Sequence, residues 1–482
     1  MFCQAQLAVN TPSKPESQQH VIKLTAPALD TVRVAFVGLG MRGPGAVERW
    51  SQIEGTDIVA LCDIEESRVD STQKILERHG RHQAATYFGD VEAYKEMCKR
   101  DDIDIVYICT DWVHHVPIAL FAMEHGKHVA IEVPAATTME DIWALVNASE
   151  RTRKHCMMLE NCVYDFFEMA CLQMAQRGLF GEVLHVEGSY LHNLEDFWTQ
   201  YWNNWRLDFN RNNRGDVYPT HGFGPDCQLL NIHRGDQLDY LVAVDTKAAN
   251  GPHQVYKQTR KVDLDFANGD QTSTLIRTEA GKTILLQHDV MTPRPYSRMY
   301  QVVGTDGYAS KYPRKELLFR PEKIKGDLMP DEPSEEVAEG ADVAEVAEGA
   351  EVAEVAEGEE ATAEGQPEQP KPDIEKLNVH ECLSDSLRDV ILQKYTPQWV
   401  KDIEEKAKAV GGHGGMDYLM DYRLVYCLRH GLPLDMDVYD MAEWCCVGPL
   451  SRISIERGSQ PVLIPDFTRG AWHEVIGFKY EF

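Results

Sequence analysis

Short apolar segments alternate with helical segments over the first third of the chain. Apolar residues recur at helical spacing over 68–78 and 116–125, where Pro117 suits a first-turn position. The apolar segments are almost continuous, as is typical of strands buried on both faces, and they cover residues 32–38, 58–62, 105–109 and 128–131. This alternation predicts βαβ units, and therefore an α/β domain with a doubly wound parallel sheet over residues 31–155.

The pattern changes after residue 161. A helix is expected over 166–177, ended by Gly178, and the segments that follow alternate apolar and polar positions as strands do. These expected strands cover residues 183–190, 258–266, 271–278 and 282–289. Strands of this kind favour a mainly antiparallel sheet with helices on one face, which makes the second domain α+β. It is assigned to residues 156–330 and 374–482, with further helices over 385–410 and 416–430 and a GHGG turn at 412–415.

Two segments lack the composition of a folded core. Residues 1–30 are polar, with Pro and Ser, and are expected to form a flexible arm. Residues 331–373 are a low-complexity segment of Glu, Val, Ala and Gly, of which 331–370 hold 15 Asp or Glu and no Lys or Arg. Like-charge repulsion and the entropy of the chain favour a disordered surface insertion there over an interaction tail.

Charge and hydropathy restrict the partners. The 482 residues include 48 Lys or Arg and 77 Asp or Glu, a net charge of −29, and −14 remains when residues 331–370 are set aside. A chain this acidic, with no basic stripe, is not expected to bind nucleic acid or an anionic membrane surface. No run of 18 apolar residues offers a membrane span. Small neutral or cationic ligands are therefore favoured.

The sequence leaves the compartment open. The first residues lack the apolar stretch of a secretory signal, yet a signal removed just before Cys3 or Gln4 would leave the same sequence, so export to the periplasm and a cytoplasmic location both stay possible. The 12 Cys have no CxxC and no regular spacing, so no metal site is expected. Several fall in strands expected to be buried, which favours reduced structural thiols.

A glycine-rich turn ends the first expected strand and precedes a helix. Its sequence, GLGMRG over residues 38–43, places Gly38, Gly40 and Gly43 where a Rossmann fold holds a dinucleotide pyrophosphate against backbone N–H groups. Asp63 follows 20 positions later, at the end of the second strand, where a carboxylate accepts hydrogen bonds from ribose hydroxyls and repels a 2′-phosphate. An NAD site is predicted, with a turn that serves packing alone as the alternative.

Two later strand ends carry polar and aromatic residues. Ligands in open α/β sheets bind outside the carboxyl ends of the strands. The segments Thr110–His115 and Glu132–Pro134 stand at such ends and are expected to line the nicotinamide half of the crevice. Loops of no catalytic consequence are the alternative.

The second domain offers groups suited to sugar chemistry. Five aromatic residues lie close together and would stack on a pyranose or belong to the core, namely Phe197, Trp198, Tyr201, Trp202 and Trp205. Arg206 would bond hydroxyl or acetamide oxygens, or form a surface ion pair. Tyr218 and His221 are three residues apart and offer a phenol and an imidazole for proton transfer if their loop takes up a helical turn.

The first domain resembles the glucose–fructose oxidoreductase, inositol dehydrogenase and MocA family, whose EKP tripeptide supplies a catalytic lysine. Here the tripeptide is EVP, at residues 132–134. Segments of the second domain resemble glycoside hydrolase family 109, the NAD-dependent α-N-acetylgalactosaminidases on the same fold. They include ENC at 160–162, GSY at 188–190, NNWR at 203–206, NRGDVYPTHG at 213–222, PYSR at 295–298 and PDFTRG at 465–470.

The resemblance implies a glycosidase that releases terminal α-linked N-acetylgalactosamine from glycans without net oxidation. In that scheme hydride leaves C3 of the sugar, the C2 proton and the aglycone are eliminated, water adds and the hydride returns. Tyr218 and His221 would handle the protons, with acid and base left unassigned. The sugar would be held by Tyr190, Arg206, Tyr218, Pro219, Thr220, His221 and Tyr296. NAD would be held by Gly38, Gly40, Met41, Arg42, Gly43, Asp63, Trp112, Val113, His114, His115, Glu132, Val133 and Asn161.

Other interpretations stay open from the sequence. A net oxidoreductase acting on a sugar or cyclitol would need exchangeable NAD, and a sugar sensor that holds NAD would have no activity. His413, in the GHGG turn, is a further candidate site residue, although a structural turn is the simpler account. The sequence does not fix the aglycone, and it is compatible with a homo-oligomer.

Overall fold

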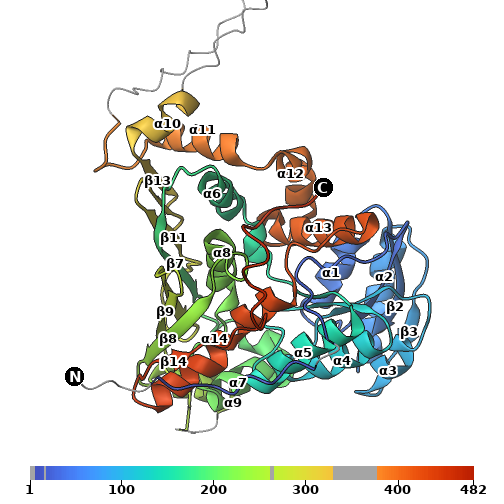
Figure 1. Cartoon of the computed structure of the whole chain (residues 1–482). Coiled ribbons are helices and arrows are strands. Elements are labelled where there is room, and N and C mark those ends of the chain that lie inside the picture. The colour runs from blue at the N-terminus through green and yellow to red at the C-terminus, as the bar shows by residue number, and fades with distance from the viewer. Residues whose placement is uncertain (1–5, 16–17, 261–264, 329–376) are drawn as a thin grey trace, which may run out of the picture.

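The structure is a computed structural model that describes residues 6–15, 18–260, 265–328 and 377–482. The whole of the acidic insertion expected over 331–373 therefore lies outside the described residues. Across the described ranges, two sheets are present, each with its own set of covering helices (Figure 1). No helix among these residues is long and apolar enough to cross a membrane.

The first sheet is parallel and has the strand order β3-β2-β1-β4-β5-β6. Its strands are β1 (Val32–Val37), β2 (Thr56–Cys62), β3 (Ala85–Tyr87), β4 (Ile105–Ile108), β5 (His128–Ile131) and β6 (Cys156–Met158). The helices between them are α1 (Gly43–Trp50), α2 (Glu66–Arg78), α3 (Ala93–Cys98), α4 (Trp112–Glu124) and α5 (Met139–Thr152). The order reverses between β1 and β4, which is the position where such sheets bind ligands.

Helix α4 begins four residues earlier than the apolar spacing predicted. Asp111 caps it, because its side chain accepts a hydrogen bond from the backbone N–H of His114. Pro117 consequently lies inside the helix and not in its first turn. The earlier start brings Trp112 and His114 to the carboxyl edge of the parallel sheet.

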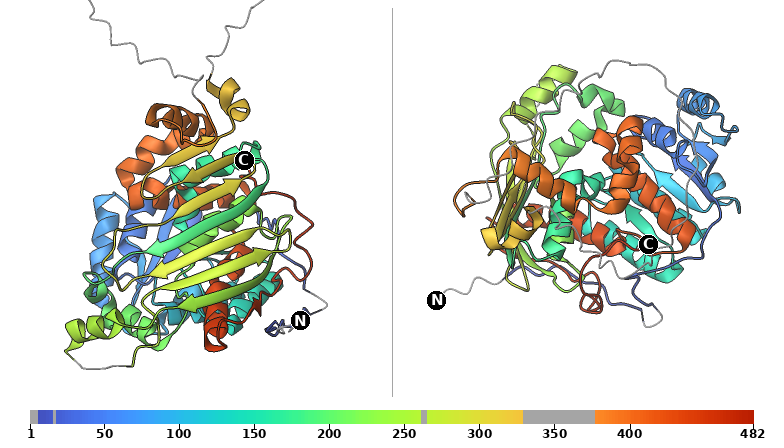
Figure 2. Two further views of the ribbon diagram at one scale, coloured as in Figure 1. Left: turned by 90° about the vertical axis from the view of Figure 1, so that its left-hand side faces the viewer. Right: turned by 90° about the horizontal axis from the view of Figure 1, so that it is seen from above.

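The second sheet has the strand order β13-β12-β11-β7-β10-β9-β8-β14, in which only the β7–β10 pair is parallel. Its strands are β7 (Val183–Leu191), β8 (Leu238–Asp245), β9 (Thr272–Thr278), β10 (Thr283–Asp289), β11 (Tyr300–Gly304), β12 (Gly307–Ser310), β13 (Glu316–Phe319) and β14 (Val462–Leu463). Helices cover one face of this sheet, whereas its other face is uncovered in the described part of the chain (Figure 2).

The strand expected over 258–266 is wrong. Residues Asn250–Thr259 form helix α9, whose first backbone N–H groups, at Asn250 and Gly251, bond the carboxylate of Asp270. Residues 261–264 lie outside the described ranges. The strands of the second sheet that were missed are β8, β11, β12, β13 and β14, and the burial of β8 does not follow a strict alternation.

The remaining helices all follow β6 in the chain. They are α6 (Phe166–Gln176), α7 (Trp205–Asn212), α8 (Thr220–Leu230), α10 (Pro321–Leu328), α11 (Asp385–Tyr395), α12 (Gln398–Val410), α13 (Met416–His430) and α14 (Val438–Glu456), with the 3-10 turns η1 (Asn161–Tyr164), η2 (Trp198–Gln200), η3 (Trp202–Asn204) and η5 (His413–Gly415). Helix α13 returns to the first domain, where Asp421 accepts hydrogen bonds from Arg49 and Tyr107. The carboxyl-terminal segment thus fixes the two domains against each other.

The described amino-terminal residues pack against the protein and differ from the flexible arm that their composition suggested. Leu7 pairs with Val462 of β14, and the backbone N–H of Val21 donates to the hydroxyl of Tyr439. Val21 and Ile22 are buried. Apolar residues scattered among polar ones are enough to hold this segment, because each meets an apolar site on the folded protein.

Helix α8 crosses β7 at backbone contact distance. A Cβ on Gly222 would lie 2.3 Å from the Ser189 nitrogen, and a Cβ on Gly188 would lie 2.7 Å from the backbone of Gly222. Only glycine at both positions allows this crossing, which sets the position of His221 over the end of β7.

Gly222→Ala should lower the free energy of unfolding by about 1–3 kcal/mol, because the added methyl group has no space at this crossing. Gly326→Ala is the matched control, since a Cβ there meets nothing within 4 Å and Gly326 is also helical. Urea unfolding followed by circular dichroism measures both. Equal stabilities of the two variants would contradict the importance assigned to the α8–β7 crossing.

Candidate functional site

The turn between β1 and α1 has the shape of a dinucleotide cradle. Gly38 has a φ of +90°, and a Cβ on it would lie 2.6 Å from the backbone of Cys109. A Cβ on Gly43 would lie 2.0 Å from the carbonyl oxygen of Gly38. At Gly40, by contrast, the nearest atom to an added Cβ is the Arg68 guanidinium at 3.7 Å. The first and third glycines are therefore needed for packing, and the second keeps the backbone accessible to a pyrophosphate.

The turn opens into a cleft of about 690 Å³, which is within the range of about 300–1,000 Å³ typical of cofactor sites. Gly40, Met41, Arg42, Asp63 and His114 all line it. Asp63 accepts hydrogen bonds from the backbone N–H groups of Leu39, at 2.6 Å, and Glu65, at 2.9 Å. These bonds fix the carboxylate at the end of β2 and leave it further lone pairs for ribose hydroxyls.

The aromatic cluster of the second domain forms the opposite wall of this cleft. Tyr201, Trp202 and Trp205 line it, while Trp198 is fully buried in the core. The ring of Trp205 also meets that of Trp112, with centroids 5.1 Å apart. The sequence left open whether these aromatic residues form a sugar platform or part of the core. Neither alternative describes the whole cluster, because Trp198 belongs to the core and three of the other rings line the dinucleotide cleft.

Seven expected cofactor residues do not line this cleft, namely Gly43, Trp112, Val113, His115, Glu132, Val133 and Asn161. Val113 is 63% exposed on the first turn of α4. His115 is buried, and its ring nitrogens lie 3.0 and 3.1 Å from the carbonyl oxygens of Pro134 and Thr110. Burial lowers the pKa of His115 to about 4, so its neutral ring donates a hydrogen bond to only one of these two carbonyl oxygens.

A network of charges lies where the nicotinamide half is expected. Glu132 is 3.7 Å from Arg42, which is 3.5 Å from Asp417 of α13. Asp417 accepts hydrogen bonds from the side-chain amide of Asn161 and from His413. The structure therefore brings His413, in the GHGG turn, beside the predicted cofactor residue Asn161, from which its ring nitrogen is 3.3 Å away.

This network has unequal effects on its two carboxyl groups. Burial raises the pKa of Glu132, although the charge of Arg42 opposes the shift. Burial by itself would also raise the pKa of Asp417. The hydrogen bond from His413 and the charges of Arg42 and Arg49 outweigh burial and hold this pKa far below the usual range. Asp417 is therefore a fixed negative charge in this network, whereas protonation of Glu132 is easier than for a solvated carboxyl group.

Tyr218, His221 and Glu160 form a buried chain of hydrogen bonds. The Tyr218 hydroxyl is 3.2 Å from Nε2 of His221, and Nδ1 of His221 is 2.6 Å from a carboxylate oxygen of Glu160. A proton on Nδ1 satisfies the carboxylate and leaves the Nε2 lone pair to accept from Tyr218. Tyr218 and His221 are only 6% and 8% exposed, so their shared side is shielded from bulk water.

Burial makes both members of the pair neutral. It lowers the pKa of His221 to about 4, although the negative charge of Glu160 raises it in part. It raises the pKa of the Tyr218 phenol well above the usual value, although the charge of Arg206 opposes this. A neutral imidazole that faces a neutral phenol is a proton acceptor facing a proton donor.

Arg206 lies among aromatic rings beside this chain. Its guanidinium carbon is 4.6 Å from the ring centroid of Tyr218, 5.2 Å from that of Trp112 and 5.9 Å from that of Tyr190. It donates a 2.6 Å hydrogen bond to the hydroxyl of Tyr201. Arg206 is thus a buried cation without a carboxylate ion pair among the described residues, and a surface ion pair is ruled out for it.

The other predicted sugar-binding residues differ in their burial and in their distance from Tyr218. The ring of Tyr190 contacts that of Tyr218, with centroids 4.8 Å apart. Pro219 and Thr220 are buried where α8 begins. Tyr296 is further out and 39% exposed, and its ring centroid is 4.8 Å from that of His192.

Glu160 and Asp417 were not among the site residues predicted from the sequence. Glu160 stands at the end of β6, so the rule that ligands lie at the carboxyl ends of parallel strands, already applied to three other strands, would have indicated it. Asp417 carries no such signal, since it belongs to a helix that the chain reaches more than 250 residues after Asn161.

Comparison with known proteins gives the two domains separate matches. Residues 32–160 match the family model described as "Oxidoreductase family, NAD-binding Rossmann fold". Residues 164–323 and 374–474 match that described as "Glycosyl hydrolase 109, C-terminal domain". Both matches agree with the fold and resemblance expected from the sequence.

Similar proteins extend over the whole length. The chain is 59% identical to glycosyl hydrolase family 109 protein 1 of Bacteroides thetaiotaomicron, over 99% of this chain and 93% of that protein. It is 56% identical to a glycosyl hydrolase family 109 protein of Porphyromonas gingivalis, with the same coverage. Among solved structures, levoglucosan dehydrogenase in complex with NADH covers 90% of this chain and 100% of its own at a TM-score of 0.61 and 15% identity, which shows the shared fold. The Rossmann domain of this chain accordingly binds NAD.

Asp63→Ala should weaken NAD binding about 10- to 100-fold, the effect of losing a hydrogen-bonding partner that carries a charge. Asp57→Ala is the control, because Asp57 lies at the start of β2, away from the cleft lining. Isothermal titration of NAD into cofactor-stripped protein measures both. Unchanged affinity in the Asp63 variant would contradict the position assigned to the ribose.

Proposed function

Because the chain belongs to glycosyl hydrolase family 109 and binds NAD, it is an NAD-dependent glycoside hydrolase, and we propose that it releases terminal α-linked N-acetylgalactosamine from glycans. We further propose that it does so through transient oxidation of the sugar, with no net redox change. The substrate part of this proposal comes from the family resemblance of the second domain, and the mechanistic part from the chemistry of the site.

The observation that carries the mechanism is the neutral His221–Tyr218 pair beside the dinucleotide cleft. Most glycosidases use two carboxyl groups on either side of the glycosidic bond, and NAD-dependent enzymes are an exception. The two carboxylates near this pair have other partners, since Glu160 accepts from His221 and Glu132 lies 3.7 Å from Arg42. A phenol and an imidazole are suited to moving protons at C–H and O–H groups instead.

Bound NAD would accept a hydride from C3 of the sugar and return it at the end, so that C3 is temporarily a ketone and the C2 proton becomes acidic. Tyr218 then exchanges protons with the sugar, and His221 accepts through Nε2 what Tyr218 releases. Glu160 stabilises the imidazolium that forms. These groups pass the C2 proton to the aglycone oxygen as it leaves C1, water then adds its hydroxyl at C1 and its proton at C2, and the O3 proton returns when the hydride does.

Other residues bind and orient the sugar in this scheme. Arg206 holds a positive charge 4.6 Å from the Tyr218 ring and favours a developing phenolate or enolate. Tyr190 and Trp112, whose rings border that of Tyr218, limit the space for the sugar. The EVP segment supplies no amine at position 133, which is the reason that proton transfer is assigned to the second domain.

The first test is hydrolysis of p-nitrophenyl α-N-acetylgalactosaminide in deuterium oxide. We expect nitrophenol release without NADH accumulation and with deuterium at C2 of the product, because C2 loses and regains a proton. Hydrolysis without deuterium at C2 would exclude elimination. Stoichiometric NADH and no nitrophenol would favour the alternative, a net sugar or cyclitol oxidoreductase.

Tyr218→Phe should lower kcat by about 100-fold or more, as loss of general acid–base catalysis does.

Glu160→Gln should lower kcat by about 100-fold or more, since an amide no longer selects the tautomer that leaves Nε2 free. The pH profile distinguishes this positioning role from a loss of folding. Activity needs neutral His221, so kcat/KM should rise with pH through about 4, where the pKa of buried His221 lies. Because the charge of Glu160 raises that pKa, the acid limb of the variant should move to lower pH. An unmoved limb would contradict the assignment.

A further inference from the structure

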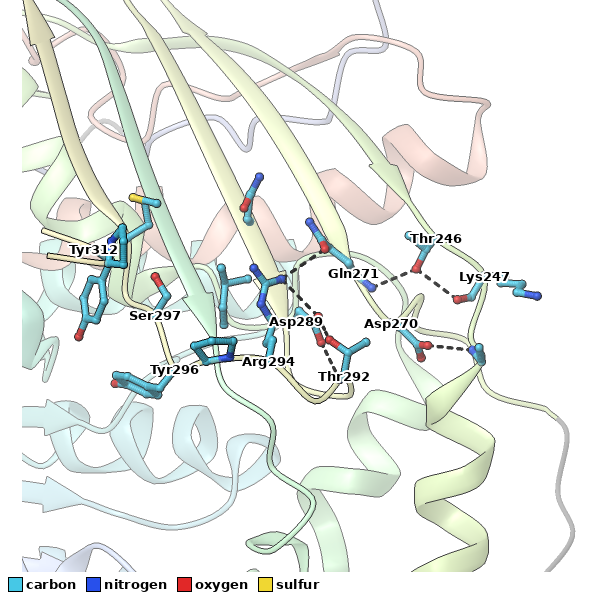
Figure 3. A pocket seen from close by; sticks show the side chains of 16 residues that line it. Thr246, Lys247, Asp270, Gln271, Asp289, Thr292, Arg294, Tyr296, Ser297 and Tyr312 are labelled. Carbon is cyan, nitrogen blue, oxygen red and sulfur yellow. Dashed lines mark hydrogen bonds and ion pairs between the residues drawn. The ribbon is translucent and has the colours of Figure 1, made fainter. Parts of the chain in front are cut away.

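A second groove, with a volume of about 610 Å³, lies at the edge of the antiparallel sheet, beyond Tyr296. The ends of β7 and β10 contribute Leu191 and Asp289 to it, and its remaining walls are loops. Figure 3 shows Tyr296 and Tyr312 at one end and Lys247 at the other. None of the proton-transfer or NAD-cleft residues lines this groove.

The carboxylates of the groove hold its shape. Asp270 accepts from the backbone N–H groups of Asn250 and Gly251, at 2.8 and 3.1 Å. Asp289 accepts from those of Met291 and Thr292, at 2.9 and 3.0 Å. Since both acids are used by the loops themselves, the groove is preformed and its acidic groups are largely satisfied.

Its donors keep hydrogen-bonding capacity. Arg294 contacts Gln271 and Asp289 only at 3.4 and 3.5 Å, and both contacts come from the same nitrogen. Most of the five N–H donors of its guanidinium are therefore available to a ligand. The buried hydroxyl of Ser297 has no hydrogen-bond partner within the described part of the chain. Lys247 is exposed at the far end. Two cations beside two carboxylates make the groove electrically balanced, which favours a neutral ligand rich in hydroxyl groups.

A row of aromatic rings joins this groove to the proton-transfer pair. The Tyr218 ring is 4.8 Å from that of Tyr190, whose hydroxyl is 3.0 Å from Nδ1 of His192. The His192 ring is 4.8 Å from that of Tyr296, which is 6.4 Å from that of Tyr312. Aromatic rings offer flat apolar faces on which the C–H faces of sugars stack.

We propose that this groove is the binding site for the neutral saccharide to which the terminal sugar is linked. The first sugar of this aglycone stacks on Tyr296 and the next on Tyr312, while Ser297, Arg294 and Lys247 bond hydroxyl groups along the groove. This inference rests on the proposed glycosidase function, and it makes the enzyme one that recognises a glycan end more than one sugar long.

The test compares two substrates in the holoenzyme, a trisaccharide in which terminal α-N-acetylgalactosamine is linked to two further neutral sugars, and the p-nitrophenyl glycoside. The measured quantity is the ratio of their kcat/KM values. Tyr312→Ala should lower this ratio about 5- to 10-fold, the effect of one lost stacking contact. Tyr312→Phe keeps the ring and should restore it. Lys247→Ala, at an exposed position, should lower the same ratio about 3-fold, as loss of one hydrogen bond does.

Tyr256→Ala is the matched control, because Tyr256 is an exposed tyrosine on α9 that does not line the groove. The ratio should not change in this variant. Ratios that stay within twofold of wild type in the Tyr312→Ala and Lys247→Ala variants, or equal losses on all substrates, would overturn the subsite while leaving the glycosidase function intact. A wild-type enzyme that cleaves none of the substrates would refute the proposed function, and this inference with it.

Discussion

The hydrogen bond between His221 and Glu160 is the contact on which the site depends. Glu160 follows the last strand of the Rossmann sheet, whereas His221 lies on the helix that crosses β7 of the second sheet, so this 2.6 Å contact joins the two domains at their reacting groups. A buried carboxylate is costly unless it is paired, and His221 and the backbone N–H of Cys162 supply its partners. The same bond selects the tautomer that faces Tyr218. The position and the protonation state of His221 thus follow from one interaction.

The second constraint is the placement of charge around the dinucleotide. Asp417 comes from α13 and meets Arg42 and Arg49 of the first domain together with Asn161. The cofactor end of the site is therefore completed by a part of the chain that follows the acidic insertion. The aromatic residues near position 200 enclose the cleft from the other side. Enclosure of this kind suits a cycle in which the cofactor is regenerated without leaving, because release would interrupt the return of hydride.

Local patterns in the sequence predicted much of this arrangement, and long-range pairing accounts for what they missed. Strand β5 begins and ends where its apolar run does, and the glycine turn with Asp63 is recognisable because each residue has a local reason for its type. Tyr218 and His221 were predicted from their three-residue spacing and their family segment. Asp417, and the contact of His413 with Asn161, depend on how distant segments pack. Helix α9 was not predicted, and the strand wrongly expected over 258–266 overlaps only its last two residues. The amino-terminal residues pack for the same non-local reason.

The central claim is a redox cycle that closes within one substrate molecule. It is tested most directly with a substrate that carries deuterium at C3, hydrolysed in the presence of excess unlabelled NAD. If the hydride removed from C3 returns to the same sugar, the released N-acetylgalactosamine keeps its deuterium at C3 and the free cofactor gains none. Loss of the C3 label from the product, or its appearance in free reduced cofactor, would contradict the account.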